Sequence, residues 1–201
     1  MFSFSGKRRS VLTAGALGAL LVALGGCNSS KEVHFTGTDI TGSKLGSALS
    51  MPDTTGQLRT LADYKGKVTL VFFGFTQCPD VCPTAMAQLA HTLELLGDQA
   101  TQVQVIMISV DPERDTPEVL SQYVQAFDPR FVGLTGTAKQ LTETAKSFKA
   151  YYAKAPGPTP DQYSMDHASS FYVFDKDGQA RILLRGDTSA EHIASDIRQL
   201  L

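Results

Sequence analysis

A nearly continuous apolar run, Val68–Gly74, leads into a turn that carries two cysteines and two prolines, and a helical pattern follows that turn. The run is apolar on both of its faces, which is typical of a central strand in a parallel sheet. The turn reads Phe75-Thr76-Gln77-Cys78-Pro79-Asp80-Val81-Cys82-Pro83. Apolar residues then recur at steps of three and four up to Gly97, namely Met86, Leu89, Leu93 and Leu96. This order predicts a strand–turn–helix unit with both thiols at the end of a buried strand.

Strand and helix patterns alternate through the rest of the chain. The predicted elements are a hairpin within 51–64, strands at 103–110 and 131–134, helices at about 116–127 and 137–148, a loop over 153–162, a hairpin of 169–175 with 179–186, and a closing helix over 189–201. Three βα units followed by ββα match an α/β, thioredoxin-like three-layer sandwich. The N-terminal hairpin and further insertions are additions to that sandwich.

The first 26 residues have the pattern of an export signal. Lys7-Arg8-Arg9 is basic, and the apolar stretch over 11–24 is shorter than the roughly 20 residues that a membrane span needs. The stretch ends in Leu24-Gly25-Gly26-Cys27, which resembles the bacterial lipobox, a signal whose cysteine is lipidated and becomes the first mature residue. The alternative is an ordinary secretory signal cleaved near Gly26, with Cys27 left as a stray thiol. Export by the Sec route or, from the loosely matching Arg8-Arg9, by the twin-arginine route stays open.

We therefore expect a lipoprotein signal peptide over 1–26, a flexible tether rich in Gly, Ser and Thr over 27–48, and a folded domain over 49–201. Such a protein is exported and anchored by lipid, facing the periplasm or the outside of the cytoplasmic membrane. The signal holds three of the 18 basic residues and none of the acidic ones, so 15 basic and 20 acidic residues remain, a net charge of −5. This balance, without a basic run, argues against nucleic-acid binding.

Lipidation of Cys27 leaves Cys78 and Cys82 as one pair. Their spacing allows a disulfide in an oxidising compartment, and it also allows both sulfurs to bind one metal ion. A single bridge is too few for a disulfide scaffold, so a chemical role is favoured over a structural one. Prolines restrict the residues before them and clash inside helices, which predicts a helix that starts at Pro83. A helix N-terminus stabilises thiolates, so we expect a lowered pKa for Cys82.

His167 lies just before the strand predicted over 169–175. Thioredoxins place a cis-proline at this point, where it receives an extended substrate chain. An imidazole in place of that proline favours a metal site over general disulfide exchange. Two thiolates and an imidazole suit copper, as trigonal Cu(I) or as Cu(II) with a fourth ligand. Asp166 is a candidate for orienting the imidazole.

Several motifs together resemble the Sco/SenC family over about residues 45–201. They are Lys65-Gly66-Lys67-Val68 with the cysteine turn, Ser109-Val110-Asp111-Pro112-Glu113-Arg114-Asp115-Thr116-Pro117, Asp166-His167, and Asp175-Lys176-Asp177-Gly178. The resemblance implies that Cys78, Cys82 and His167 bind copper and that the protein delivers it to the CuA site of cytochrome c oxidase. It also implies an oxidase subunit II or a similar copper acceptor, an upstream periplasmic copper donor, and membrane contact through the Cys27 lipid.

A second reading needs Cys78 and Cys82 alone: a thiol–disulfide reductase that keeps the cysteines of an oxidase subunit reduced. The two roles can coexist, because copper enters a CuA-type site only when its cysteines are reduced. A peroxidase is disfavoured, since Thr76 lies two residues before Cys78, where the peroxiredoxin pattern has three. The segment 111–116 is interpreted as strand-end and helix-cap structure with an Arg114 ion pair, or as a partner-docking surface.

Overall fold

The computed structural model describes residues 1–3, 34–158 and 162–201. The chain divides into two units, Met1–Val33 and His34–Leu201, and the elements below lie in the second. Residues 4–26 of the predicted signal peptide, and Cys27, fall outside the described residues. Within the described ranges, no helix is long and apolar enough to cross a bilayer.

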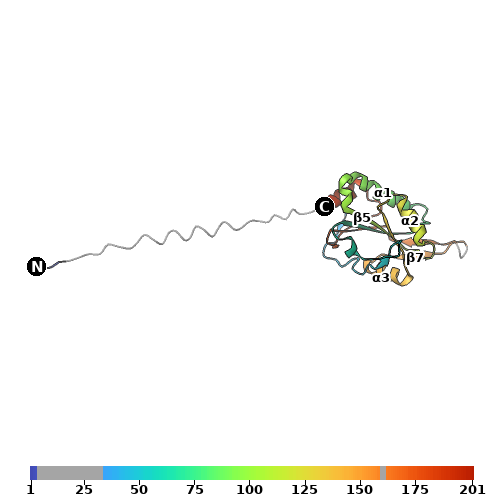
Figure 1. Cartoon of the computed structure of the whole chain (residues 1–201), viewed down its shortest axis with the longest axis horizontal. Coiled ribbons are helices and arrows are strands. Elements are labelled where there is room, and N and C mark those ends of the chain that lie inside the picture. The colour runs from blue at the N-terminus through green and yellow to red at the C-terminus, as the bar shows by residue number, and fades with distance from the viewer. Residues whose placement is uncertain (4–33, 159–161) are drawn as a thin grey trace. The chain divides into compact units, whose positions relative to one another are not determined.

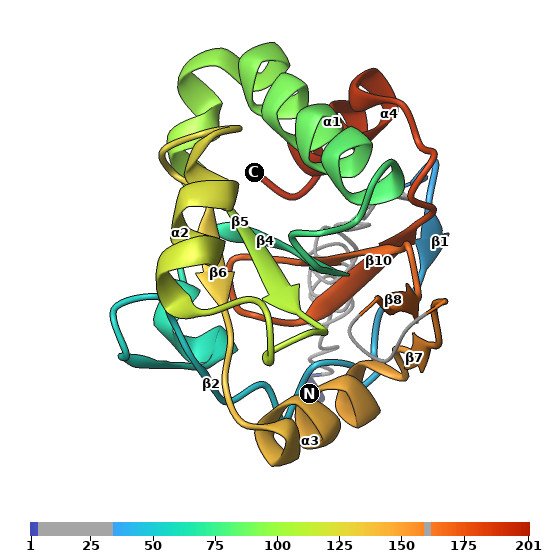
Figure 2. The same ribbon diagram turned by 90° about the vertical axis from the view of Figure 1, so that its right-hand side faces the viewer.

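A six-stranded mixed sheet forms the centre of the second unit, in the order β1-β10-β9-β4-β5-β6. Its strands are β1 (Thr38–Asp39), β4 (Val68–Gly74), β5 (Val103–Ser109), β6 (Val132–Leu134), β9 (Phe171–Phe174) and β10 (Ala180–Leu184). β4, β5 and β6 run parallel, whereas β9 is antiparallel to β4 and β10 is antiparallel to β9. All seven residues of β4 are buried, as its apolar sequence predicts, because strands flank it on both sides and helices cover both faces of the sheet (Figures 1 and 2).

Helices cover both faces of this sheet, so the predicted three-layer sandwich is confirmed (Figures 1 and 2). α1 and α4 lie together on one face, and α3 lies on the opposite face. The helices are α1 (Val81–Leu96), α2 (Pro117–Gln125), α3 (Ala138–Phe148) and α4 (Ala190–Arg198), and short 3₁₀ segments are η1 (Leu61–Tyr64) and η2 (Gly97–Gln102). Thr116, Thr137 and Ser189 cap α2, α3 and α4 by accepting a backbone N–H, which explains why these helices begin where they do.

The N-terminal hairpin is also confirmed: β2 (Met51–Pro52) pairs with β3 (Leu58–Arg59) around the expected turn. The turn is held by Asp53, whose carboxylate accepts hydrogen bonds from Thr55 and Gln57 and pairs with Arg59 at 2.7 Å.

The predicted start of α1 at Pro83 is wrong by two residues, because the helix begins at Val81. Pro83 lies in the first turn, where backbone N–H groups have no partner within the helix. The residue with which its ring would clash, four positions back, is Pro79, which lies outside the helix. Proline is therefore tolerated at this position.

Residues 34–48, expected within the flexible tether, are structured instead. β1 pairs antiparallel with the edge strand β10. The buried carboxylate of Asp196 in α4 accepts the backbone N–H groups of Thr36 and Gly37 at 2.8 and 3.0 Å. A two-residue edge strand has no period that a sequence pattern could show, and its partners lie about 150 residues further along the chain.

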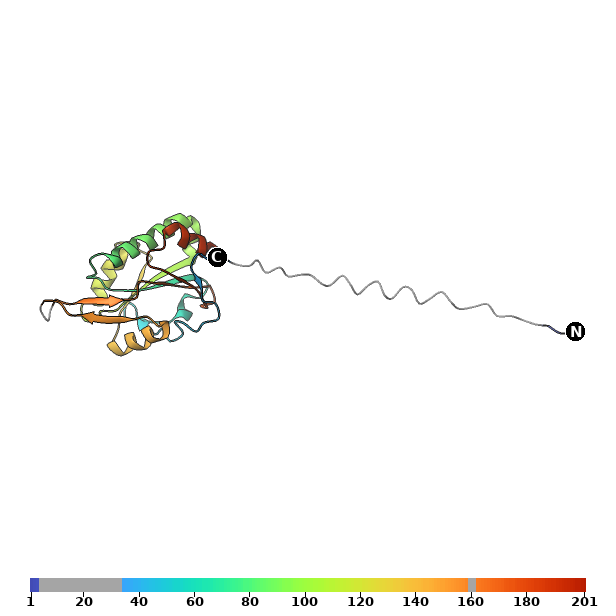
Figure 3. The ribbon, with the colours of Figure 1, turned by 180° about the vertical axis from the view of Figure 1, so that it is seen from behind.

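The loop predicted over 153–162 is instead part of a hairpin. β7 (Tyr152–Ala155) pairs antiparallel with β8 (Ser164–His167), and together they form a two-stranded sheet separate from the central one. Figure 3 shows this hairpin projecting at one end of the body. Three of the four residues of β8 are not buried, so the strand lacks the apolar pattern that would predict it.

Candidate metal centre

The sulfurs of Cys78 and Cys82 and a ring nitrogen of His167 all lie within 4.8 Å of one another. Cys78 belongs to the turn after β4, Cys82 to the first turn of α1, and His167 is the last residue of β8. Both cysteines are free thiols. Within the described part of the chain, no other three His, Cys, Asp or Glu side chains converge in this way. The fold therefore brings the three predicted ligands together.

Short contacts link the three side chains. The backbone N–H of Cys82 donates to the sulfur of Cys78, with an N···S distance of 3.3 Å. The sulfur of Cys82 lies 3.3 Å from Nε2 of His167. The backbone N–H of Cys78 donates to the carbonyl of Phe75, and this hydrogen bond closes the turn that carries Cys78.

The orientation of His167 is fixed by its other ring nitrogen. Nδ1 lies 3.0 Å from the carbonyl oxygen of Ala168, and a carbonyl can only accept, so Nδ1 carries the proton. The lone pair on Nε2 then faces Cys82, as a metal ligand requires. The rings of Phe72 and Phe75 contact the imidazole edge-on, at centroid distances of 5.9 and 5.8 Å.

Ala168, rather than the predicted Asp166, is the hydrogen-bond partner that orients the ring. Asp166 is exposed on the hairpin, and its charge acts only to raise the pKa of His167. Asp80 occupies the N-cap position of α1, although its side chain makes no capping hydrogen bond.

Burial dominates the electrostatics of the site. It raises the pKa of the fully buried Cys82 thiol well above its usual value, and a hydrogen bond from the Phe75 backbone only partly opposes this. The expected lowering by the helix N-terminus is therefore wrong. Burial also lowers the pKa of His167, against the opposing effect of the Ala168 carbonyl. Without a metal the site accordingly holds a protonated Cys82 thiol and a neutral imidazole, and metal binding would release the thiol proton.

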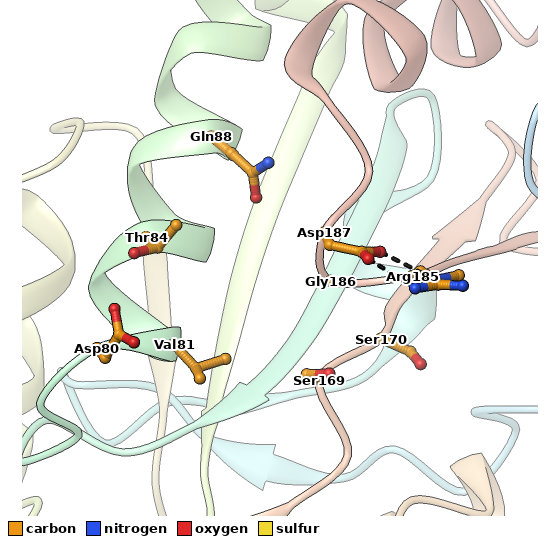
Figure 4. A pocket seen from close by; sticks show the side chains of 9 residues that line it. All are labelled: Asp80, Val81, Thr84, Gln88, Ser169, Ser170, Arg185, Gly186 and Asp187. Atoms are coloured by element: carbon orange, nitrogen blue, oxygen red, sulfur yellow. Dashed lines mark hydrogen bonds and ion pairs between the residues drawn. The ribbon is translucent and has the colours of Figure 1, made fainter.

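A cavity of about 410 Å³ opens beside the site and gives it access to solvent. Its lining includes Cys78 and His167, the buried thioether residue Met165, and the exposed apolar residues Val81 and Tyr151. A second cavity, of about 490 Å³, adjoins it through the shared residues Asp80, Val81 and Ser169. Figure 4 shows this second cavity between α1, with Thr84 and Gln88, and the ion pair of Arg185 with Asp187.

A buried carboxylate, that of Asp115, holds the cysteine turn through hydrogen bonds. Asp115 is fully buried and accepts hydrogen bonds at 2.6 Å from the hydroxyl groups of Thr76 and Ser109. It also accepts the backbone N–H of Thr76, two residues before Cys78. The sequence suggested strand-end and helix-cap structure with an Arg114 ion pair, or a partner-docking surface, for this segment, because nothing in a local pattern shows that its carboxylate reaches the turn after β4.

The fold and the site together define a thioredoxin-like protein in which two cysteines and a histidine converge as a donor set suited to a soft metal ion. The family model described as SCO1/SenC matches residues 37–201. The chain therefore belongs to the SCO1/SenC family, as the motifs predicted.

Individual relatives agree with this assignment. A SCO2-like protein of Rickettsia prowazekii is 36% identical over 151 residues, which are 75% of this chain and 74% of the relative. The solved structure of Bradyrhizobium japonicum ScoI with copper bound is 35% identical, with a TM-score of 0.70 over 82% of this chain and 99% of that one. BsSco, described as a member of the Sco family of cytochrome c oxidase assembly proteins with a disulfide switch, is 28% identical, with a TM-score of 0.60 over 82% of this chain and 96% of its own.

Proposed function

We propose that this protein is a copper chaperone for respiratory oxidase assembly, which binds copper through Cys78, Cys82 and His167 and delivers it to the CuA site of cytochrome c oxidase. The observation that carries the proposal is the convergence of two sulfurs and one imidazole nitrogen within 4.8 Å, beside a solvent-accessible cavity. The copper-bound relative and the oxidase-assembly relative support the choice of metal and of pathway.

The donor set fits copper as cargo. Thiolates are soft ligands that favour Cu(I), and imidazole binds both copper oxidation states. Three such donors are the number that trigonal Cu(I) requires. The adjoining cavity leaves room for the fourth ligand that Cu(II) prefers, supplied by water or by a partner protein. The same opening would let an acceptor's own ligands approach the bound ion.

Cys27 supplies the membrane anchor in this proposal. Its lipid would hold the chaperone at the outer face of the cytoplasmic membrane or elsewhere facing the periplasm, where an oxidase subunit II presents its copper site. A periplasmic copper donor would load the chaperone there. The support is the lipobox-like sequence that ends at Cys27.

Copper titration of the reduced protein tests the site. The parent should bind one copper ion, and His167→Ala should bind both oxidation states more weakly. His91→Ala is a matched control, because His91 is a half-exposed histidine paired with Glu94 on α1. Equal binding by the parent and His167→Ala would rule out the three-ligand site.

A second candidate function, thiol–disulfide reduction, is favoured by the free, adjacent pair Cys78 and Cys82 and by the disulfide switch described for BsSco. In this role a thiolate of the pair attacks a disulfide of the partner, and the second cysteine then closes the Cys78–Cys82 disulfide as the partner's thiols leave reduced. Exchange with an oxidised peptide that carries the two cysteines of a CuA site measures it. A rate unchanged by His167→Ala would support this role, and no exchange would exclude it.

A further inference from the structure

The ligand His167 is carried by a hairpin that is separate from the central sheet, whereas both cysteines belong to the β4–α1 unit. The distance between the imidazole and the thiols therefore depends on what fastens the hairpin to the rest of the fold. Arg114, in the connection between β5 and α2, makes contacts on both sides of this division.

The guanidinium of Arg114 joins three segments. One nitrogen, Nη1, donates to the carbonyl of Tyr163, directly before β8, at 2.9 Å. The same nitrogen donates to Oε1 of Gln77, directly before Cys78, at 3.1 Å. Its Nε pairs with the carboxylate of Asp111.

Tyr163 is held by more than its backbone. Its ring stacks on the guanidinium of Arg114, with the central carbon 3.7 Å from the ring centroid. Its hydroxyl donates to Asp111 at 2.7 Å. On the other side, Lys154 of β7 lies 4.4 Å from the same ring and pairs with Glu113 at 2.6 Å. Both strands of the hairpin are thus tied to the β5–α2 connection.

The chemistry of these contacts requires arginine. A guanidinium is planar, permanently charged, and able to stack and donate several hydrogen bonds at once, whereas a lysine ammonium is a point charge on a flexible stem. The Arg114 side chain is 17% exposed and that of Asp111 is 1% exposed. Removing Arg114 would leave the Asp111 carboxylate buried without its cation, which is strongly unfavourable.

We propose that Arg114 is a positioning residue for the metal site: by tying the Tyr163 end of β8 to the cysteine turn, it sets the separation of His167 from Cys78 and Cys82 and so the affinity for copper. The part concerning affinity rests on the proposed copper-binding function. The part concerning the hairpin stands on the contacts alone, and the two are tested separately.

Amide hydrogen exchange of the metal-free protein tests the hairpin. In Arg114→Lys and Arg114→Ala, the paired amides of β7 and β8 should exchange faster than in the parent, while those of β4 and β5 stay protected. Tyr163→Phe keeps the ring stack and loses only the bond to Asp111, so its effect should be smaller. Arg130→Lys is the matched control, because Arg130 makes a comparable pair with Asp128 at 2.6 Å on the β6 side of the sheet.

Copper affinity tests the consequence for the site. Competition with a Cu(I) chelator should show about tenfold weaker binding or more for Arg114→Lys, the range typical of residues that orient metal ligands. The Cu(II) spectrum of the variant should also change. In a His167→Ala background, Arg114→Lys should cause no further loss, because Arg114 acts through the imidazole.

Each outcome decides the proposal. Faster hairpin exchange together with a copper loss that disappears in the His167→Ala background supports it. Unchanged exchange overturns it, as does an equal copper loss in both backgrounds or faster exchange with unchanged affinity. If the parent itself binds no copper, the proposed function fails, and hydrogen exchange alone still decides whether Arg114 holds the hairpin.

Discussion

The sulfur of Cys82 lies 3.3 Å from Nε2 of His167, although the two residues are 85 positions apart in the chain. One is fully buried at the start of a helix, and the other ends a strand of a separate hairpin. Their contact joins the core of the fold to the β7–β8 hairpin. It also places a thiol and a neutral imidazole where one soft metal ion can bind both.

Replacement of either cysteine by serine should abolish tight copper binding, because a hydroxyl is a poor ligand for Cu(I). The two variants should differ in stability. Cys82→Ser buries a hydroxyl at a fully buried position and should cost about 1–3 kcal/mol, whereas Cys78→Ser, which is partly exposed, should cost less. Copper titration and urea unfolding of the two variants measure these effects. Equal stabilities would contradict the difference in burial.

Gly74→Ala should weaken copper binding without touching a ligand. A Cβ atom at this position would lie 3.1 Å from the sulfur of Cys82 and 2.7 Å from the ring of Phe72. Such overpacking costs about 1–3 kcal/mol and would displace the sulfur. Gly133→Ala, in β6, is equally crowded, at 2.6 Å from Leu120, but no cysteine is among its nearest neighbours. Both variants should lose stability in urea unfolding, and only Gly74→Ala should alter the copper spectrum.

The N-terminal hairpin should make stability depend on pH through Asp53. Burial alone would raise the pKa of this carboxyl, but the hydrogen bonds from Thr55 and Arg59 outweigh it and lower the pKa to about 2, from a usual value of 3.8. The carboxylate therefore contributes stability above about pH 4, which is lost as the pH falls from 4 towards 2. The loss in the free energy of unfolding is at most about 2.5 kcal/mol. Urea unfolding between pH 2 and 6 should show this loss of stability in the parent and not in Asp53→Asn. Parallel curves of stability against pH for the two proteins would contradict the prediction.

Asp115→Asn should loosen the cysteine turn. The carboxylate accepts hydrogen bonds from Thr76 and Ser109, and an amide in its place offers one oxygen and two unwanted donors. Leaving buried groups unpaired costs about 1–3 kcal/mol. Unfolding experiments should show this loss, together with faster amide exchange at residues 76–78. Asp98→Asn, at an exposed position in η2, should change neither.

Lipid attachment at Cys27 is tested on the full chain in a bacterial host. Mass spectrometry should find the mature protein to begin at a lipidated Cys27, and Cys27→Ser should move the protein from the membrane fraction to the soluble fraction. Cys78→Ser serves as the control and should stay with the membrane. A Cys27→Ser protein that remains membrane-bound would show that another segment holds it there.

The sequence was sufficient to single out Cys78, Cys82 and His167 and to predict five of the six strands of the central sheet, all except β1. The signals for β4 and the cysteines are local, because β4 is a nearly continuous apolar run and the cysteines follow it at fixed spacing. The helix caps at Thr116, Thr137 and Ser189 likewise have local signatures.

What the sequence left unpredicted depends on contacts between distant segments. β1 exists because β10 offers a free edge and because Asp196 accepts two of the neighbouring N–H groups. The pKa of Cys82 is raised by burial, and burial depends on the packing of distant segments, which the spacing of residues in the sequence does not show. The role of Arg114 was also not predictable from local sequence, because its partners Gln77 and Tyr163 lie 37 and 49 positions away.

The separate two-stranded sheet of β7 and β8 divides the site between two bodies. The thiols belong to the β4–α1 unit of the core, while the imidazole belongs to the β7–β8 hairpin. A small displacement of that hairpin would convert a three-coordinate site into a two-coordinate one without disturbing a single strand of the central sheet. Retention and release of a bound ion would then depend on the contacts that hold this hairpin, those of Arg114 and Lys154 among them, rather than on the pairing of the central strands.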